Sequence, residues 1–217
     1  MNEHPGVPFD RLRANGCFDT KYTLCRGLRG LINMEYSKAD LEDLYEGKLP
    51  WPRVKEIMSR PKDDDRFDKY IEILQERVPW PERILLPISE HLYVVEKDGE
   101  RIVKCDCGHE FGDYRINWKL GCRVYVRKTR EEIGEIVTIP EARHNTDMVQ
   151  MREFYCPGCY ALLGVEVVPP GYPPIFEMLP DLDTFYREWL GQPLPDESPD
   201  WFADKTLEKP AEWAKEG

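Results

Sequence analysis

Apolar residues recur at helical spacing over much of the first third of the chain. Between residues 63 and 78, Phe67, Tyr70, Ile71 and Leu74 fall on one side of a helix that follows a run of acidic residues. Prolines directly after this segment end the pattern. The same spacing predicts shorter helices over 37–48 and 51–58, and a helix near the carboxyl end over 181–191.

Capping residues support two of the shorter helices. Ser37 is followed three residues later by Asp40, and Thr129 is followed in the same way by Glu132. A hydroxyl at the cap and an acid three residues on can satisfy each other's free N–H groups at a helix start. We therefore expect a helix to begin after Ser37 and a short one to cover 129–136.

After residue 87 the apolar positions alternate with a period of two, which is typical of strands. The segments 91–97 and 100–105 flank Asp98-Gly99, a dipeptide that favours a two-residue hairpin turn. Further strands are predicted over 122–128, 148–156 and 161–168. Helices followed by a run of strands predict an α+β fold: a small antiparallel β-sheet with N-terminal helices and one C-terminal helix.

Changes in pattern divide the chain into four regions. Residues 1–33 show neither period, and we expect either a translated extension before a native start at Met34 or a disordered arm. Residues 34–82 form a helical region, and 83–191 a β-rich domain with the C-terminal helix. Residues 192–217 are rich in proline and acids, a composition that predicts a mobile tail.

Composition narrows the possible functions. Hydrophobic residues make up 41% of the 217 residues, enough for a core, and the net charge of -11 gives no overall attraction to nucleic acid or to an anionic membrane. We find no secretory signal and no apolar run of membrane-spanning length. The expected compartment is the cytoplasm, where thiols stay reduced, so seven cysteines suggest a metal site before disulfides.

Four of the cysteines form two pairs at predicted strand ends. Cys105 and Cys107 are one residue apart, and Cys156 and Cys159 enclose Pro-Gly. Zinc favours four thiolates in a tetrahedron, and a closed structural site uses all four positions. We therefore predict a zinc-ribbon-like four-cysteine site formed by these residues. A redox dithiol fits less well, because a strand rather than a helix follows Cys159.

Two other residues are alternatives near this site. His109 could replace Cys107 as a ligand, although a histidine beside such a turn more often makes local hydrogen bonds or faces solvent. Cys122 has no paired neighbour and is expected to be a small buried apolar residue. An open catalytic zinc site would need a water and a general base, and the sequence indicates neither.

Residues 114–130 contain six Lys or Arg, no acid and several aromatic residues. Such a stretch can bind nucleic acid, dock on a partner protein, or form the solvated face of a sheet. We favour the partner surface, because the whole chain is acidic. The four histidines are scattered, and no phosphate-binding glycine loop, nucleophile elbow or HExxH motif occurs, so no catalytic residues are predicted in this chain.

From about Met34 to Leu194 the chain resembles the gamma subunit family of acetone carboxylase. The resemblance rests on GKLPWPRVKEIMSRPKDDDRFDKYIEILQERVPW, CDCGHEFGDYRINWKL, REFYCPGC and PPIFEMLPDLDTFYREWLG. It implies that the chain is the small zinc-bearing subunit of an assembly of two alpha, two beta and two gamma subunits. Cys105, Cys107, Cys156 and Cys159 match the cysteine positions of the family.

The resemblance also implies a reaction. Enzymes of this kind carboxylate acetone with bicarbonate at the expense of ATP and give acetoacetate, AMP and phosphate. ATP, magnesium and a manganese-type metal are expected on the large subunits, and this chain alone is not expected to be catalytic. The alternatives are the small subunit of a related ketone carboxylase, such as one acting on acetophenone, and a free zinc-ribbon protein that binds nucleic acid.

Overall fold

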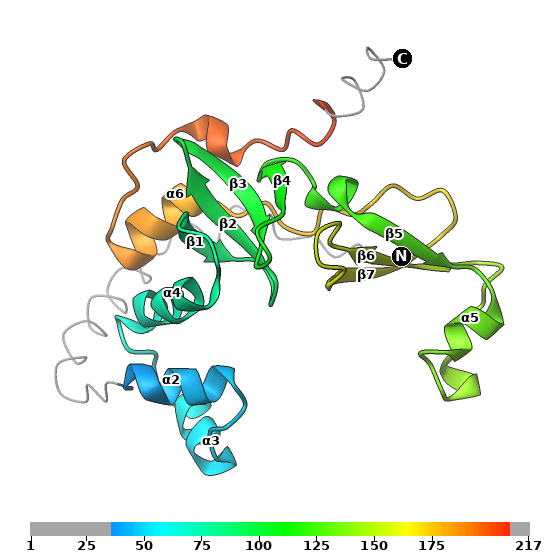
Figure 1. Ribbon diagram of the computed structural model, residues 1–217, viewed down its shortest axis with the longest axis horizontal. Helices are drawn as coiled ribbons and strands as arrows, with labels where there is room; N and C mark the ends of the chain where they lie inside the picture. Colours follow the sequence, from blue (N-terminus) through cyan, green and yellow to red (C-terminus); the bar gives the residue numbers. More distant parts are fainter. Residues whose placement is uncertain (1–35, 209–217) are drawn as a thin grey trace, which may run out of the picture. The chain divides into compact units, whose positions relative to one another are not determined.

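The computed structural model describes residues 36–208, so the expected extension over 1–33 lies outside the described residues. Figure 1 shows its elements. The chain divides into two compact units, one ending at Arg66 and the other beginning at Phe67, and each is described by itself.

The first unit contains two helices. Helix α2 (Lys38–Tyr45) begins with the predicted capping box, in which the Ser37 hydroxyl accepts from the Asp40 N–H. Helix α3 (Trp51–Ser59) has proline in its first turn, where no N–H is needed. The guanidinium groups of Arg53 and Arg66 lie 4.9 and 5.1 Å from the ring centroid of Tyr36, which is buried.

The second unit contains α4 (Arg66–Arg77), apart from its first residue, and a four-stranded antiparallel sheet. Its strands lie in chain order: β1 (Arg83–Pro87), β2 (Leu92–Lys97), β3 (Glu100–Cys105) and β4 (Glu110–Asp113). The β2–β3 hairpin turns at Asp98 and Gly99, both with positive φ, as the dipeptide predicts. Because the apolar face of α4 packs with this sheet around Leu74 and Trp80, α4 groups with the β-rich unit rather than with the preceding helices.

A separate three-stranded antiparallel sheet follows. It contains β5 (Arg123–Arg127), β6 (Gln150–Tyr155) and β7 (Leu162–Val168) in that order, with β6 in the centre (Figure 1). The 3₁₀-helix η3 (Trp118–Gly121) precedes β5, while α5 (Arg130–Gly134) and the 3₁₀ turn η4 (Pro140–Ala142) lie between β5 and β6. Helix α5 has the predicted Thr129/Glu132 capping box.

The two sheets share one apolar core. Leu92 and Val103 of the first sheet belong to the same buried cluster as Phe154 and Leu163 of the second. The α+β class and antiparallel pairing predicted from the sequence are confirmed. However, the strands form two sheets where the alternating pattern suggested a single one, because strand periodicity does not indicate which strands pair.

The C-terminal helix is present, but most of it is wider than an α-helix. A single turn, α6 (Leu182–Thr184), continues as a π-helix, η5 (Phe185–Leu190), and ends at Gly191 with φ 70°. Tyr186 projects from this helix into the core and donates its hydroxyl hydrogen to the Leu85 carbonyl at 2.8 Å. The helix therefore attaches to the first sheet.

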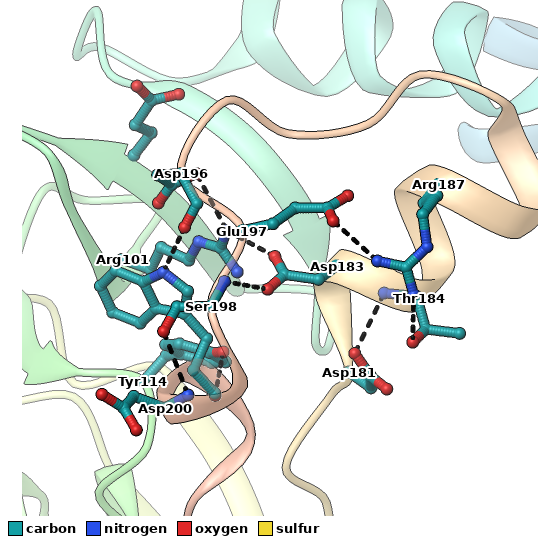
Figure 2. A network of polar contacts seen from close by, with 12 residues as sticks. Arg101, Tyr114, Asp181, Asp183, Thr184, Arg187, Asp196, Glu197, Ser198 and Asp200 are labelled. Carbon is teal, nitrogen blue, oxygen red and sulfur yellow. Dashed lines mark hydrogen bonds and ion pairs between the residues drawn. The ribbon is translucent and has the colours of Figure 1, made fainter.

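Composition predicts a mobile tail over 192–217, but its described part, residues 192–208, makes specific contacts; residues 209–217 lie outside the described residues. Arg101 of β3 is buried, and its Nη2 donates to Asp183 at 2.6 Å and to Asp196 at 2.9 Å (Figure 2). The guanidinium lies 4.7 Å from the ring centroid of Trp201, in the short helix η6 (Pro199–Phe202). Asp196 and Trp201 of this segment therefore attach it to Arg101 in the first sheet. The sequence pattern does not reveal these contacts, because Arg101 lies far from both residues in the chain.

Candidate metal centre

The four predicted cysteines come together from two separate turns. Cys105 ends β3, and its N–H donates to the His109 carbonyl at 2.8 Å while Gly108 donates back to the Cys105 carbonyl at 2.9 Å. Cys156 follows β6, and its N–H donates to the Ala161 carbonyl at 3.0 Å. Each turn therefore leaves its strand with a local hydrogen-bonded loop that carries two sulfurs.

The sulfur positions match a tetrahedral metal site. All four ligand atoms lie within 4.8 Å of one another. The Sγ atoms of Cys105 and Cys159 are 3.8 Å apart, and those of Cys107 and Cys156 are 3.7 Å apart. A tetrahedron with metal–sulfur bonds of about 2.3 Å has edges of about 3.8 Å. The donor set is therefore already close to the geometry that a zinc-sized ion requires.

Two glycines make this arrangement possible. Gly108 has φ +96°, a conformation that side chains with a Cβ rarely adopt. A Cβ added at Gly158 would lie 3.2 Å from the Cys107 sulfur and 3.2 Å from the His109 Cβ. The Gly158 N–H lies 3.4 Å from the Cys156 sulfur and donates to it. Glycine at 158 thus allows the two turns to approach and supplies an N–H to a ligand sulfur.

The environment separates the four thiols into an inner and an outer pair. Cys105 and Cys156 are buried, whereas Cys107 and Cys159 are exposed. Burial raises the pKa of the Cys105 and Cys107 thiols above the ordinary value. Burial also opposes ionisation of Cys156, but N–H groups of Cys159 and Gly158 stabilise its thiolate and bring its pKa below the ordinary value. A bound divalent cation would lower the pKa of all four thiols, because it favours the thiolate at every position.

Two residues just before strands of the first sheet support the Cys105 turn: Trp80 precedes β1 and His91 precedes β2. The indole N–H of Trp80 donates to the carbonyls of Cys105 and Asp106, each at 3.1 Å. His91 lies beside the turn, with its Nδ1 2.6 Å from an Asp106 carboxylate oxygen. Neither residue stands out in the sequence, because Trp80 lies 25 positions before the turn that its indole reaches. Such contacts orient a ligand-bearing turn without touching the ion.

The two neighbouring candidates, His109 and Cys122, do not belong to the group of possible metal ligands. The His109 ring stacks edge-on against Phe111, with centroids 4.9 Å apart. Cys122 is half-buried, its sulfur faces the Trp118 carbonyl at 3.8 Å, and burial raises its pKa to about 12. In the described part of the chain, only Cys105, Cys107, Cys156 and Cys159 gather as a group of possible metal ligands.

The basic stretch 114–130 is less positive than its sequence suggests. Lys119 is buried against Glu166 at 2.7 Å, Arg115 forms an ion pair with Asp113 at 2.6 Å, and Arg127 forms one with Glu153 at 2.8 Å. Half of its cations are therefore neutralised within the chain. This pairing weakens the case for a nucleic-acid surface, which depends on cations free to meet phosphates.

The fold and the cysteine cluster together define a small α+β protein whose two sheets meet at a four-sulfur centre suited to a metal ion. Residues 78–190 match the model of the acetone carboxylase gamma subunit family. Over 166 residues the chain is 42% identical to the acetone carboxylase gamma subunit of Xanthobacter autotrophicus, covering 75% of this chain and 98% of the relative. The chain belongs to the acetone carboxylase gamma subunit family.

A second relative belongs to a carboxylase with a different name. The acetophenone carboxylase beta subunit of Aromatoleum aromaticum is 31% identical over 83 residues. This match covers 36% of the present chain and 62% of the relative. No helix in the range 36–208 has the length and apolar character that a membrane crossing needs.

Proposed function

We propose that this chain is the gamma subunit of an ATP-dependent acetone carboxylase. The observation that carries the proposal is the 42% identity to a gamma subunit over 98% of that relative's length. The proposed complex contains two alpha, two beta and two gamma subunits and converts acetone and bicarbonate to acetoacetate, with ATP giving AMP and phosphate. We place the nucleotide, the magnesium and a manganese-type metal on the large subunits, and the complex in the cytoplasm.

Within this complex the role proposed for the chain is structural. Cys105, Cys107, Cys156 and Cys159 would hold one zinc ion, which supplies a rigid tetrahedral link between the two turns. The sulfur spacing supports this assignment, since the pairs at 3.8 and 3.7 Å match the edge of a four-thiolate zinc site. Structural zinc can contribute about 10–16 kcal/mol, more than the net stability of many domains.

Reconstitution tests the proposed function. The two large-subunit genes are expressed with and without this chain, and ATP-dependent formation of acetoacetate from acetone and labelled bicarbonate is measured. We expect the three chains to purify together and activity to depend on this one. If the large subunits alone formed acetoacetate at the full rate, the subunit role would be wrong.

A second candidate is the small subunit of an acetophenone-type carboxylase. The 31% identity to an acetophenone carboxylase beta subunit supports it. The same reconstituted complex distinguishes the two, because the ketone is selected by the large subunits. A complex that carboxylates acetophenone but not acetone would favour this candidate, and the reverse preference would favour the first.

A further inference from the structure

Exposed apolar side chains are distributed unequally between the two sheets. Strands β1–β4 place no large apolar residue among those that are strongly exposed in the range 36–208. In contrast, the short β5–β6–β7 sheet exposes five of its strand residues: Val124, Tyr125, Leu162, Val165 and Val167. An apolar concentration of this kind marks an interaction surface more often than scattered single residues do.

Strand register assigns most of these residues to one face. Residues that pair across an antiparallel sheet point to the same side, and every second residue along a strand does so. We call this side the outer face. Its three rows run from β5 across β6 to β7: Arg123, Tyr155, Leu162; Tyr125, Glu153, Val165; and Arg127, Met151, Val167.

The opposite, inner face is covered over strands β6 and β7, where Phe154, Arg152 and Glu166 are buried. A Cβ added at Gly164 would lie 3.3 Å from the Trp118 ring, so η3 packs directly on this side. Glu166 also points inward and accepts a hydrogen bond from Lys119 at 2.7 Å. On the outer face Glu153, Met151 and Arg127 are buried, whereas the apolar residues of β7 and Tyr125 of β5 remain exposed.

The polar groups at the centre of the outer face satisfy one another. Glu153 accepts from Arg127 Nε at 2.8 Å and from the Tyr155 hydroxyl at 2.8 Å. Arg127 also donates to Glu135 at 2.6 Å. Glu153 and Arg127 are thus already buried and paired within the chain, so covering the face would mainly bury the apolar side chains of β7, which is favourable.

Strand β7 lacks the usual protection of an exposed sheet edge. It pairs with β6 alone, so its other edge has no strand beside it in the described structure. Edge strands are normally protected by lysine, proline or charges on the exposed side. Between Leu162 and Val168 the only charged residue is Glu166, and it is buried on the inner face. Nothing on β7 therefore opposes the approach of another protein.

The β5 side of the same sheet is basic. Arg123 is exposed on the outer face, and its guanidinium lies 5.4 Å from the ring centroid of Tyr160. Lys128 and Arg130 follow just after the strand and are also exposed. Among the carboxylates of residues 36–208, none forms a salt bridge with these three cations. They differ in this from the paired cations elsewhere in the basic stretch.

We propose that the outer face, from β7 to β5, is the surface by which this chain docks on a large subunit of the carboxylase. The partner surface is apolar opposite Leu162, Val165 and Val167, and acidic opposite Arg123 and Lys128. The proposal rests on the proposed function, because that function supplies the large subunits.

A second copy of the chain fits this face less well. In a two-fold symmetric dimer the same patch meets itself, so each group must find its counterpart within the patch. The one carboxylate on the outer face, Glu153, is already bonded to Arg127 and Tyr155. Self-docking would therefore leave Arg123 and Lys128 without an acidic partner, whereas a different protein can supply one.

A pair of matched valine variants tests the surface. Val167 on the outer face and Val124 on the inner side of the β5 edge are 49% and 47% exposed. The tagged full-length chain, carrying Val167→Glu or Val124→Glu, is expressed with the two large subunits, and the captured amount is titrated. We expect Val167→Glu to weaken capture about tenfold or more, and Val124→Glu to leave it within about twofold. Metal content and thermal unfolding of each variant verify the fold.

Charge reversal tests the basic side separately. Arg123→Glu is compared with Lys55→Glu, an equal charge change in the first unit. We expect Arg123→Glu to slow association several-fold at low salt, with a smaller effect at high salt. Equal association rates for the two variants would remove the acidic-partner part of the proposal.

Three other outcomes would overturn the docking surface. Val167→Glu could capture the large subunits as well as the wild type does, or both valine variants could lose capture equally with their folds intact. Val167→Glu could also dissociate a homodimer without affecting capture, which would assign the face to a second copy. If the wild-type chain captured no large subunit at all, the proposed function itself would fail, a result distinct from the other three.

Discussion

Glu166 gives the sharpest test of how the inner face of the β5–β6–β7 sheet is stabilised. Its side chain is 2% exposed and accepts from Lys119 at 2.7 Å, from Arg152 at 2.5 Å and from the Ile175 N–H at 2.9 Å. Both cations are themselves buried. Removing the carboxylate charge therefore leaves two buried positive groups close together.

The expected loss can be set against a control on the same lysine. Lys119 also forms a 2.6 Å ion pair with Glu177, whose side chain is 58% exposed. Breaking a buried ion pair costs about 3–5 kcal/mol, whereas exposed pairs contribute about 0–1 kcal/mol. We therefore expect Glu166→Gln to lower the free energy of unfolding by about 3 kcal/mol or more, and Glu177→Gln by less than about 1 kcal/mol.

Urea unfolding of the zinc-loaded full-length chain at neutral pH measures both losses. Glutamine keeps the shape of Glu166 and can still accept from Ile175, but its amide N–H₂ must face one of the cations. The slope of unfolding free energy with urea should stay constant, so that the midpoint reports stability. If the free energies of unfolding of the two variants fell by the same amount within about 0.5 kcal/mol, burial would not determine how much each ion pair contributes to stability.

Three further predictions concern acid, metal and the tail. Burial opposes ionisation of Glu166, but hydrogen bonds from Lys119 and Ile175 outweigh it and hold its pKa below the ordinary 4.5. Its contribution to stability is complete above that value and is lost as pH falls through the lower folded value, so acid titration should destabilise the wild type more than Glu166→Gln. Cys156→Ser should lose zinc and unfold, whereas Cys122→Ser should keep one zinc per chain by native mass spectrometry; a compact zinc-free Cys156→Ser chain would contradict the site. Asp183→Asn should expose the 194–206 segment to proteolysis more than Asp196→Asn, because Asp183 is the more deeply buried partner of Arg101 (Figure 2); equal cleavage would argue against that ranking.

Features determined by neighbouring residues could be predicted from the sequence. The hairpin at Asp98-Gly99 follows from two residues that tolerate positive φ, and the capping box at Thr129 follows from two side chains on one turn. The convergence of the four cysteines was also predictable, because each pair lies at a strand end and a tetrahedral ion requires two such pairs. In each case the chemistry is contained in a few adjacent positions.

Features determined by distant partners could not be predicted. Strands β1 and β4 were missed, because RILLP does not alternate and EFGD is too short to show a period. The charge of the basic stretch was overestimated for the same reason. Lys119 is paired with Glu166, which lies 47 positions later in the sequence. The pairing of Asp183 and Asp196 with Arg101 also joins residues far apart in the sequence. Composition alone does not reveal it, and therefore predicted mobility for a segment that the pairing holds in place.

The origin of the two cysteine pairs in different sheets affects how the protein can be made. Cys105 and Cys107 leave the ribosome well before Cys156 and Cys159, so a nascent chain has only half of the ligand set for that interval. If the ion is zinc, its capture can be completed only after β6 has been synthesised. In a zinc-starved cell, the supply of this small chain would then limit the amount of finished carboxylase, however abundant its larger companions are.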